Sequence, residues 1–177
     1  MSTASIAPPS AAAAAPAGEA PLNRQIVVAF VESIRSVYAT MLGTQVQALT
    51  PYLKPDIGGP HDVSGVIGFS GGFHGSVTVG FPRDVAEKSV AAFAGTALPM
   101  GTADFADAVG ELTNMVAGAA KSTLNGGASI STPVVVVGTA HTMPRLKDVP
   151  SIVIPCRCKF GDFSVEVNMK QQHGHRG

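Results

Sequence analysis

The sequence predicts an α+β domain built on an antiparallel or mixed β-sheet. Two segments of about twenty residues, 22–42 and 104–124, repeat apolar residues at the spacing of an amphipathic helix. Shorter segments of alternating or continuous apolar residues lie between and after them, and several are joined by glycine-containing turns. The expected order is helix, hairpin, two helices, strand and hairpin, which favours neighbouring strands that run antiparallel.

The two ends of the chain are expected to lie outside this domain. Residues 1–21 are rich in Ala and Pro, lack a basic segment and are interrupted by prolines, so a disordered tail is favoured over a signal peptide. The predicted domain spans residues 22–170, and residues 171–177 are expected to form a mobile tail. A single domain fits the length of 177 residues.

Composition and charge exclude several classes of partner. The chain carries 12 basic and 12 acidic residues with no Lys/Arg-rich block, so no nucleic-acid partner is expected. No apolar run approaches the roughly 20 residues of a membrane span, so no membrane partner is expected either. The two cysteines, Cys156 and Cys158, are too close in sequence for a long-range disulfide, which fits a reducing compartment and a cytoplasmic location.

The first predicted helix covers residues 22–42 and ends near Gly43. Its apolar residues recur at helical spacing and comprise Val27, Phe30, Val31, Ile34, Val37, Tyr38 and Met41. Residues 52–62, rich in Pro and Gly, are expected to connect this helix to the sheet.

A β-hairpin is predicted after this connection. Residues 73–81 alternate between apolar and small or polar side chains, and Ser70-Gly71-Gly72 provides a turn back to residues 66–69. Pro82 then begins a short helix that Gly95 ends, because proline suits the start of a helix and glycine suits a left-handed cap.

The second half of the chain begins with a predicted long helix over residues 104–124. Asp104 is expected to be its N-cap, and Asn125-Gly126-Gly127 is expected to close it. Four valines at residues 134–137 then predict a short buried strand.

A second hairpin is predicted at the C-terminal end of the domain. It joins residues 152–160 to residues 163–169 through a turn at Gly161-Asp162. Pro155 lies inside the first of these strands, which predicts an edge position or a bulge, because proline cannot donate a ladder hydrogen bond.

The long helix over residues 104–124 has two different faces. On a helical wheel one face gathers Phe105, Val109, Leu112, Val116, Ala119 and Thr123. The opposite face is a narrow stripe of Asp107, Glu111, Asn114 and Gly118, with Lys121 beside it. The helix is therefore expected to bury the first face and to present the stripe.

The residues on the presented side are unusual for a merely solvated helix. Gly110, Asn114 and Gly118 form an i, i+4, i+8 row, and each interior glycine costs about 1 kcal/mol relative to alanine. The simplest reason is that another backbone approaches closely, with Glu111 and Asn114 pointing together into the contact. A solvated face or an intramolecular contact is the alternative, because E-x-x-N occurs by chance in many helices.

A carboxylate beside a carboxamide suits the hydrolysis of an acyl phosphate. That reaction needs a water held in line with phosphorus and charge stabilised on the equatorial oxygens. The Asn114 amide can hold a water through its carbonyl oxygen or its NH₂ group, and the leaving group is already activated. The Glu111 carboxylate can bind a lysine on a partner and fix the register of the contact.

The string DAVGELTNMVAGAAKSTL resembles the signature helix of CheX, CheC and the flagellar switch phosphatases. The pattern of that family is an acidic residue or serine, then E-x-x-N, then a glycine four residues after the asparagine. Asp107, Glu111, Asn114 and Gly118 match this pattern position by position. The strings VSGVIGFSGGFHGSVTVGFPRDVAEKSVAAFAG and ISTPVVVVG are also similar to family segments, so the resemblance covers roughly residues 25–169.

The resemblance implies a CheX-like fold, with two long helices on one side of the sheet, and a phosphatase that hydrolyses the aspartyl phosphate of CheY-type receiver domains. It implies that Glu111 pairs with the receiver's active-site lysine and that Asn114 orients the attacking water. The residues expected to contact the partner are Asp107, Gly110, Gly118 and Lys121. The receiver is expected to supply Mg²⁺, so the chain needs no cofactor or metal of its own. A homodimer joined through sheet elements is also implied, in chemotaxis or related two-component signalling.

One departure from the CheC pattern lies in the first helix. CheC-type chains carry the motif in both halves, but here Arg35 stands three residues after Glu32, where the pattern has Asn. Arginine has no carbonyl acceptor, and its bulk would fill the place of the water. One active helix per chain is therefore expected, which favours CheX over CheC.

Two alternatives stay open. The chain could be a catalytically inactive CheX-like adaptor or dimerisation module that binds a receiver domain without hydrolysis. Cys156 and Cys158 could also hold zinc together with His173 and His175. Their strand face is apolar, so buried packing is favoured for the cysteines and no metal site is predicted.

Overall fold

The computed structural model describes residues 20–54, 61–143 and 145–172 of the chain. Within these ranges one sheet has eight antiparallel strands in the order β1-β7-β8-β4-β3-β5, with β2 also beside β7 and β6 also beside β3. The strands are β1 (Gln47–Ala48), β2 (Tyr52–Leu53), β3 (His61–Gly71), β4 (Phe73–Phe81), β5 (Ala128–Ile130), β6 (Val134–His141), β7 (Ile152–Cys158) and β8 (Gly161–Gln171). The helices are α1 (Ala20–Met41), α2 (Arg83–Ala94) and α3 (Ala103–Thr123), so the predicted α+β class is confirmed.

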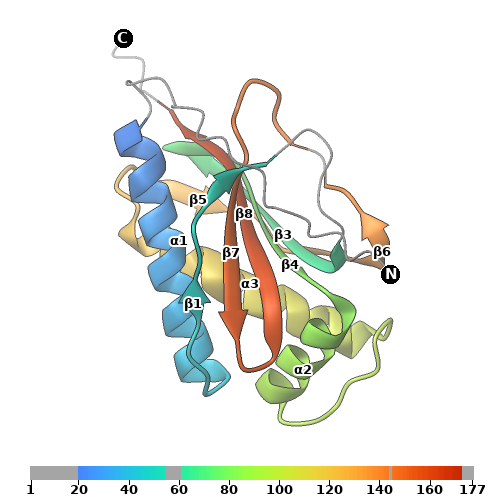
Figure 1. The fold of residues 1–177 in the computed structure, drawn as a ribbon. Helices are drawn as coiled ribbons and strands as arrows, with labels where there is room; N and C mark the ends of the chain where they lie inside the picture. Colours follow the sequence, from blue (N-terminus) through green and yellow to red (C-terminus); the bar gives the residue numbers. More distant parts are fainter. Residues whose placement is uncertain (1–19, 55–60, 144, 173–177) are drawn as a thin grey trace, which may run out of the picture.

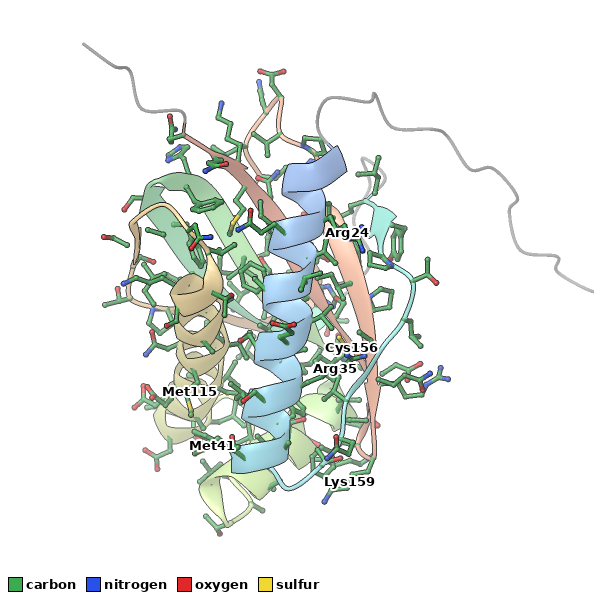
Figure 2. The ribbon with its side chains drawn as sticks, turned by 90° about the vertical axis from the view of Figure 1, so that its left-hand side faces the viewer. Arg24, Arg35, Met41, Met115, Cys156 and Lys159 are labelled. Atoms are coloured by element: carbon green, nitrogen blue, oxygen red, sulfur yellow. The ribbon has the colours of Figure 1, made fainter. Side chains whose placement is uncertain are left out.

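The two long helices, α1 and α3, pack on the same side of the sheet (Figure 1), and a view turned by 90° shows them side by side (Figure 2). Their apolar faces meet the inward-facing side chains of the sheet, as the resemblance implied. The largest fully buried side chains include Phe30, Tyr38, Phe73, Phe81 and Phe105. Tyr38 of α1 also stacks on Phe163 of β8, with ring centroids 4.9 Å apart.

The predicted first hairpin is present as β3 and β4, whose register runs from Val63 opposite Phe81 to Phe69 opposite Gly75. The predicted connection over residues 52–62 is wrong at both ends. Its first two residues form β2 and pair with β7, and β3 already begins at residue 61. A two-residue edge strand is too short to show an alternating pattern, which is why the sequence did not reveal it.

Thr102, and not Asp104, is the N-cap of α3. Thr102 has an extended backbone, and its hydroxyl oxygen accepts a hydrogen bond from the backbone N–H of Phe105 at 3.3 Å. Asp104 lies one residue inside the helix, where its carboxylate faces the positive end of the helix dipole. The predicted ends of α2 are confirmed, since Pro82 is its N-cap and Gly95 its left-handed C-cap.

Strand β6 is not the buried strand that its four valines predict. Val134 is 60% exposed and Val137 is 39% exposed, and the two valines between them are half-buried. Among the described residues β6 pairs with β3 alone, at one edge of the sheet. A run of β-branched residues suits an edge strand as well as a central one, so composition did not distinguish the two.

Pro155 lies in β7 opposite the gap between two short strands. β1 pairs with residues 156–157 and β2 pairs with residues 152–153. The carbonyl oxygen of Pro155 accepts a hydrogen bond from the backbone N–H of Leu49 at 2.8 Å. The nitrogen of a strand residue points to the same side as its carbonyl, so the proline removes no hydrogen bond to β8. β7 is thus paired on both sides and keeps a regular register with β8, so Pro155 lies at a gap in the pairing and not at the predicted edge or bulge.

The ends of the described chain differ slightly from the predicted boundaries. The C-terminal hairpin turns at residues 159–160, because Gly161 already belongs to β8. β8 continues to Gln171, and α1 begins at Ala20. The rest of the two predicted tails, residues 1–19 and 173–177, lies outside the described residues.

A buried polar cluster lies on the sheet face opposite the helices. The carboxylate of Glu166 accepts hydrogen bonds from Lys54 Nζ at 2.5 Å and from His61 Nε2 at 2.9 Å, and these side chains are only 10 to 13% exposed. Burial by itself would raise the pKa of Glu166. Hydrogen bonds and charge from His61 and Lys54 outweigh burial and hold that pKa below its usual value.

Candidate functional site

Helix α3 buries one broad face and holds the candidate site on the other. Of the residues assigned to the apolar face, Phe105, Val109, Leu112 and Val116 are buried, Ala119 is half-buried and Thr123 is exposed. The buried face is wider than predicted, because it also includes Ala108, Gly110, Thr113, Ala117 and Ala120. All but the last turn of α3 therefore packs against the rest of the domain.

The predicted polar stripe lies on the solvent side of α3. Asp107 and Glu111 are exposed, and Asn114, Gly118 and Lys121 are half-buried. Neither the Glu111 carboxylate nor the Asn114 amide has a hydrogen bond or ion pair within the described part of the chain. Residues three apart on a helix are neighbours, so both groups are presented together and are available to a partner.

Gly110 and Gly118 differ in what a side chain would meet. A Cβ at Gly110 would lie 3.3 Å from Cγ of Pro133 and 3.6 Å from Cγ2 of Val135. The small size of Gly110 therefore serves a contact within the chain, which was the alternative reading of the glycine row. A Cβ at Gly118 would meet nothing within 4 Å, so no contact in the described chain requires glycine there.

An open depression of about 530 Å³ lies between α3 and the start of β6. Its lining comprises Ala106, Asp107, Gly110, Glu111, Pro133 and Val135. Two carboxylates thus stand beside an apolar floor, next to Asn114. Gly110 lies in the lining of this depression, at the point where the helix packs closely against Pro133.

Two further contacts fix α3 in the turns that carry the stripe. Thr113 is 1% exposed and faces β3, where a Cβ at Gly65 would lie 1.9 Å from the Thr113 hydroxyl oxygen. Ser33 of α1 donates a buried hydrogen bond to the carbonyl oxygen of Val116. The sequence reasoning missed both contacts. The available signal was Gly65 itself, because a glycine inside a strand pattern often marks a close approach of another element.

The first helix does not reproduce this arrangement. Glu32 and Arg35 are both exposed on α1. Figure 2 shows Arg35 on the side of α1 that is turned away from α3, beside Cys156. Burial raises the pKa of the Cys156 thiol to about 12, although the nearby Arg35 charge acts in the opposite direction. A guanidinium therefore occupies the position where the family pattern has a carboxamide.

The described residues contain no group of three or more His, Cys, Asp or Glu side chains that could hold a metal ion. Cys156 is buried, Cys158 is half-buried, and both are free thiols. His173 and His175, the other members of the zinc alternative, lie outside the described residues. No helix in the described ranges is long and apolar enough to cross a membrane.

Comparison with known proteins supports the resemblance. A family model described as "chemotaxis phosphatase CheX" matches residues 63–157. The chain is 34% identical to a chemotaxis protein CheX from Desulfovibrio desulfuricans, with a TM-score of 0.75 over 84% of this chain and 99% of that chain. It is 30% identical to the chemotaxis protein CheX from Vibrio vulnificus, with a TM-score of 0.76 over 82% of this chain and 99% of that chain. A search of curated protein sequences gave no significant match.

A further similar structure is a complex of CheX with CheY, BeF3 and Mg²⁺ from Borrelia burgdorferi. It matches at a TM-score of 0.67 and 18% identity, over 82% of this chain and 98% of that chain, which indicates a common fold. The family model spans more than half of the chain, and the two CheX proteins above match most of its length at 30% identity or more. The chain therefore belongs to the chemotaxis phosphatase CheX family.

Proposed function

We propose that this chain is a phosphatase that hydrolyses the aspartyl phosphate of a CheY-type receiver domain. The observation that carries the proposal is the pair of Glu111, which is exposed, and Asn114, which is half-buried, on the solvent side of α3. Neither side chain has a hydrogen bond or ion pair within the described part of the chain. Membership of the CheX family supports the activity. The complex of CheX with CheY from Borrelia burgdorferi supports a receiver domain as the partner.

Asn114 positions the attacking water in this mechanism. Its amide enters the receiver's site and holds one water in line with phosphorus. The water oxygen bonds to phosphorus while the bond from phosphorus to the receiver's aspartate oxygen breaks, which releases inorganic phosphate and a free carboxylate. The carboxylate is a good leaving group, so the amide does not need to act as a strong base.

Glu111 sets the register of the complex. Its exposed carboxylate binds the receiver's active-site lysine through a charge-assisted hydrogen bond. Asp107 on the same stripe and Lys121 beside it contact the partner's surface. Gly118 leaves room for the partner's backbone, and Gly110 lines the depression beside Asp107 into which the partner would reach.

The receiver domain completes the site. It supplies the phosphate, the lysine and Mg²⁺, which offsets the negative charge of the phosphoryl oxygens. Arg35 leaves α1 without a water-positioning amide, so each chain has one catalytic helix. The proposed setting is the cytoplasm, in chemotaxis or a related two-component pathway.

We also propose that two copies associate along β6. The outer edge of this strand has no partner among the described residues, and Val134 and Val137 are exposed on it. An unpaired strand edge with apolar side chains is a template for pairing with another chain. Light scattering is expected to give the mass of a dimer, and a monomer at high protein concentration would contradict this arrangement.

The activity is tested by following the loss of phosphate from phosphorylated receiver domains of the same organism. The wild-type chain is expected to accelerate this loss, and a Glu32→Ala variant serves as a control on the other long helix. An inactive adaptor would bind the receiver domain loaded with beryllium fluoride and leave the phosphate lifetime unchanged. That pair of results would contradict the proposal.

A further inference from the structure

Thr113 lies one residue before Asn114 and faces the sheet. Its side chain is 1% exposed, and its hydroxyl donates a hydrogen bond to the carbonyl oxygen of Val109 at 2.7 Å. A Cβ at Gly65 of β3 would lie 1.9 Å from Thr113 Oγ1, 2.9 Å from its Cβ and 3.2 Å from its Cγ2. Helix α3 therefore rests directly on the backbone of β3 at this point.

Gly65 is glycine for reasons of space and not of conformation. Its backbone has no positive φ, and it lies inside β3, opposite Val79 of β4 and Val135 of β6. Rotating the Thr113 side chain would not admit a methyl group at Gly65, because Thr113 Cβ itself is too close. A larger residue at this position must move α3 away from the sheet.

We propose that Thr113 and Gly65 are positioning residues for Asn114. Their contact sets the height of α3 above the sheet, and thereby how far the Asn114 amide reaches into the receiver's site. This inference rests on the proposed phosphatase activity. Thr113 and Gly65 are buried and do not touch the substrate, but on this proposal they help to determine the rate of hydrolysis.

The two stripe residues respond differently to a displacement of α3. Asn114 has a short side chain that must hold a water in line, and a misplacement of about 1 Å can cost about a hundredfold in rate. Glu111 has a longer side chain with more rotamer freedom, so its carboxylate can follow the receiver's lysine when the helix shifts. Raising α3 is therefore expected to slow hydrolysis much more than it weakens docking.

The experiment compares Gly65→Ala, Thr113→Ala and the double variant with the wild type. Gly68→Ala is the matched control, because a Cβ at Gly68 of the same strand would make an ordinary 3.5 Å contact with Ser131 Oγ. For each protein three quantities are measured: kcat with a phosphorylated CheY-type receiver domain, Kd for that domain loaded with beryllium fluoride, and the thermal unfolding midpoint.

Gly65→Ala is expected to lower kcat by about 30- to 100-fold while Kd changes by less than about threefold. The added Thr113→Ala removes Oγ1, the closest clashing atom, together with Cγ2, and leaves only the Cβ contact at 2.9 Å. It is therefore expected to recover part of that loss, by at least about threefold. Gly68→Ala is expected to keep both wild-type values. Recovery of kcat in the double variant at unchanged Kd is a result that a general loss of folded protein would not produce.

Two variants at Thr113 keep the test valid if Gly65→Ala does not fold. Thr113→Ala alone is expected to lower kcat by about three- to tenfold, and Thr113→Ser, which keeps the hydroxyl, is expected to retain the wild-type rate. A wild-type kcat in Gly65→Ala or in Thr113→Ala would overturn the positioning role. A wild-type chain with no activity would instead overturn the proposed function.

Discussion

Gly110 of α3 packs against Pro133, since a Cβ on the glycine would lie only 3.3 Å from Cγ of the proline. This contact holds the start of β6 beside the helix one residue before Glu111. Gly118, two turns later, faces open space. Two glycines that occupy equivalent places in the sequence pattern therefore have different roles. Gly110 allows a close contact within the chain, and Gly118 leaves the exposed surface of the helix without a side chain.

Gly118→Ala is expected to stabilise the fold by about 0.5–1 kcal/mol, because alanine favours a helix and its methyl group meets no atom. The same variant is expected to weaken binding of the receiver domain, whose backbone approaches this position. Gly110→Ala serves as the comparison, and the crowding against Pro133 is expected to remove most of the gain. Urea unfolding measures both variants, and equal gains at the two positions would contradict this account.

Arg35→Ala is expected to leave kcat/KM within about twofold of the wild type, since a surface side chain away from the site contributes little. The physical reason is that Arg35 projects from the side of α1 away from α3 and offers no carbonyl oxygen to a water. The dephosphorylation assay measures the rate. A loss of kcat/KM as large as that of an Asn114 variant would show that α1 takes part in the site.

Glu166→Gln is expected to lower the free energy of unfolding at pH 7 by about 1–3 kcal/mol, because the buried Lys54 and His61 lose a charged acceptor. The pKa of Glu166 is depressed in the folded protein, so its stabilisation is present above the usual value of 4.5 and is lost as the pH falls through the folded value.

Urea unfolding at a series of pH values tests whether the stabilisation by Glu166 is lost as the pH falls. The wild type and Glu166→Gln are expected to converge as the pH falls below 4.5 and through the depressed pKa of Glu166, where the carboxylate of the wild type becomes protonated. Glu87→Gln is the control, because Glu87 forms only an exposed pair with Arg83 on α2, which is worth less than about 1 kcal/mol. A constant difference between the wild type and Glu166→Gln from pH 7 to pH 3 would exclude the linkage.

The helices could be predicted closely from the sequence, because the apolar residues of the two long helices repeat every three to four positions and the ends of α2 carry Pro82 and Gly95. The strands at the edges of the sheet could not be predicted in this way. Strands of two residues show no alternation, and the valines of β6 would look the same in a central strand. The cap of α3 was misplaced by two residues, because Thr102 and Asp104 are both suitable cap residues and only the backbone geometry distinguishes them.

The candidate site could also be predicted only in part, because some of its contacts depend on the folded chain. A helical wheel places Glu111 and Asn114 on the solvent side of α3, and the family pattern gives them roles. The wheel could not show that Gly110 meets Pro133 or that Thr113 rests on Gly65, because these contacts depend on strands far away in the sequence. The parts of the site that support the pair are therefore visible only in the folded chain.

The most direct test of the central claim measures binding and hydrolysis together for Asn114→Ala. The variant is expected to bind the receiver domain loaded with beryllium fluoride within about threefold of the wild-type Kd, since Glu111 still holds the lysine. Its kcat for the phosphorylated receiver is expected to fall by at least about a hundredfold, which is the usual cost of losing one preorganised polar group at the reacting centre. Equal hydrolysis by the wild type and Asn114→Ala would contradict the account, because the water would then be positioned by a group other than Asn114.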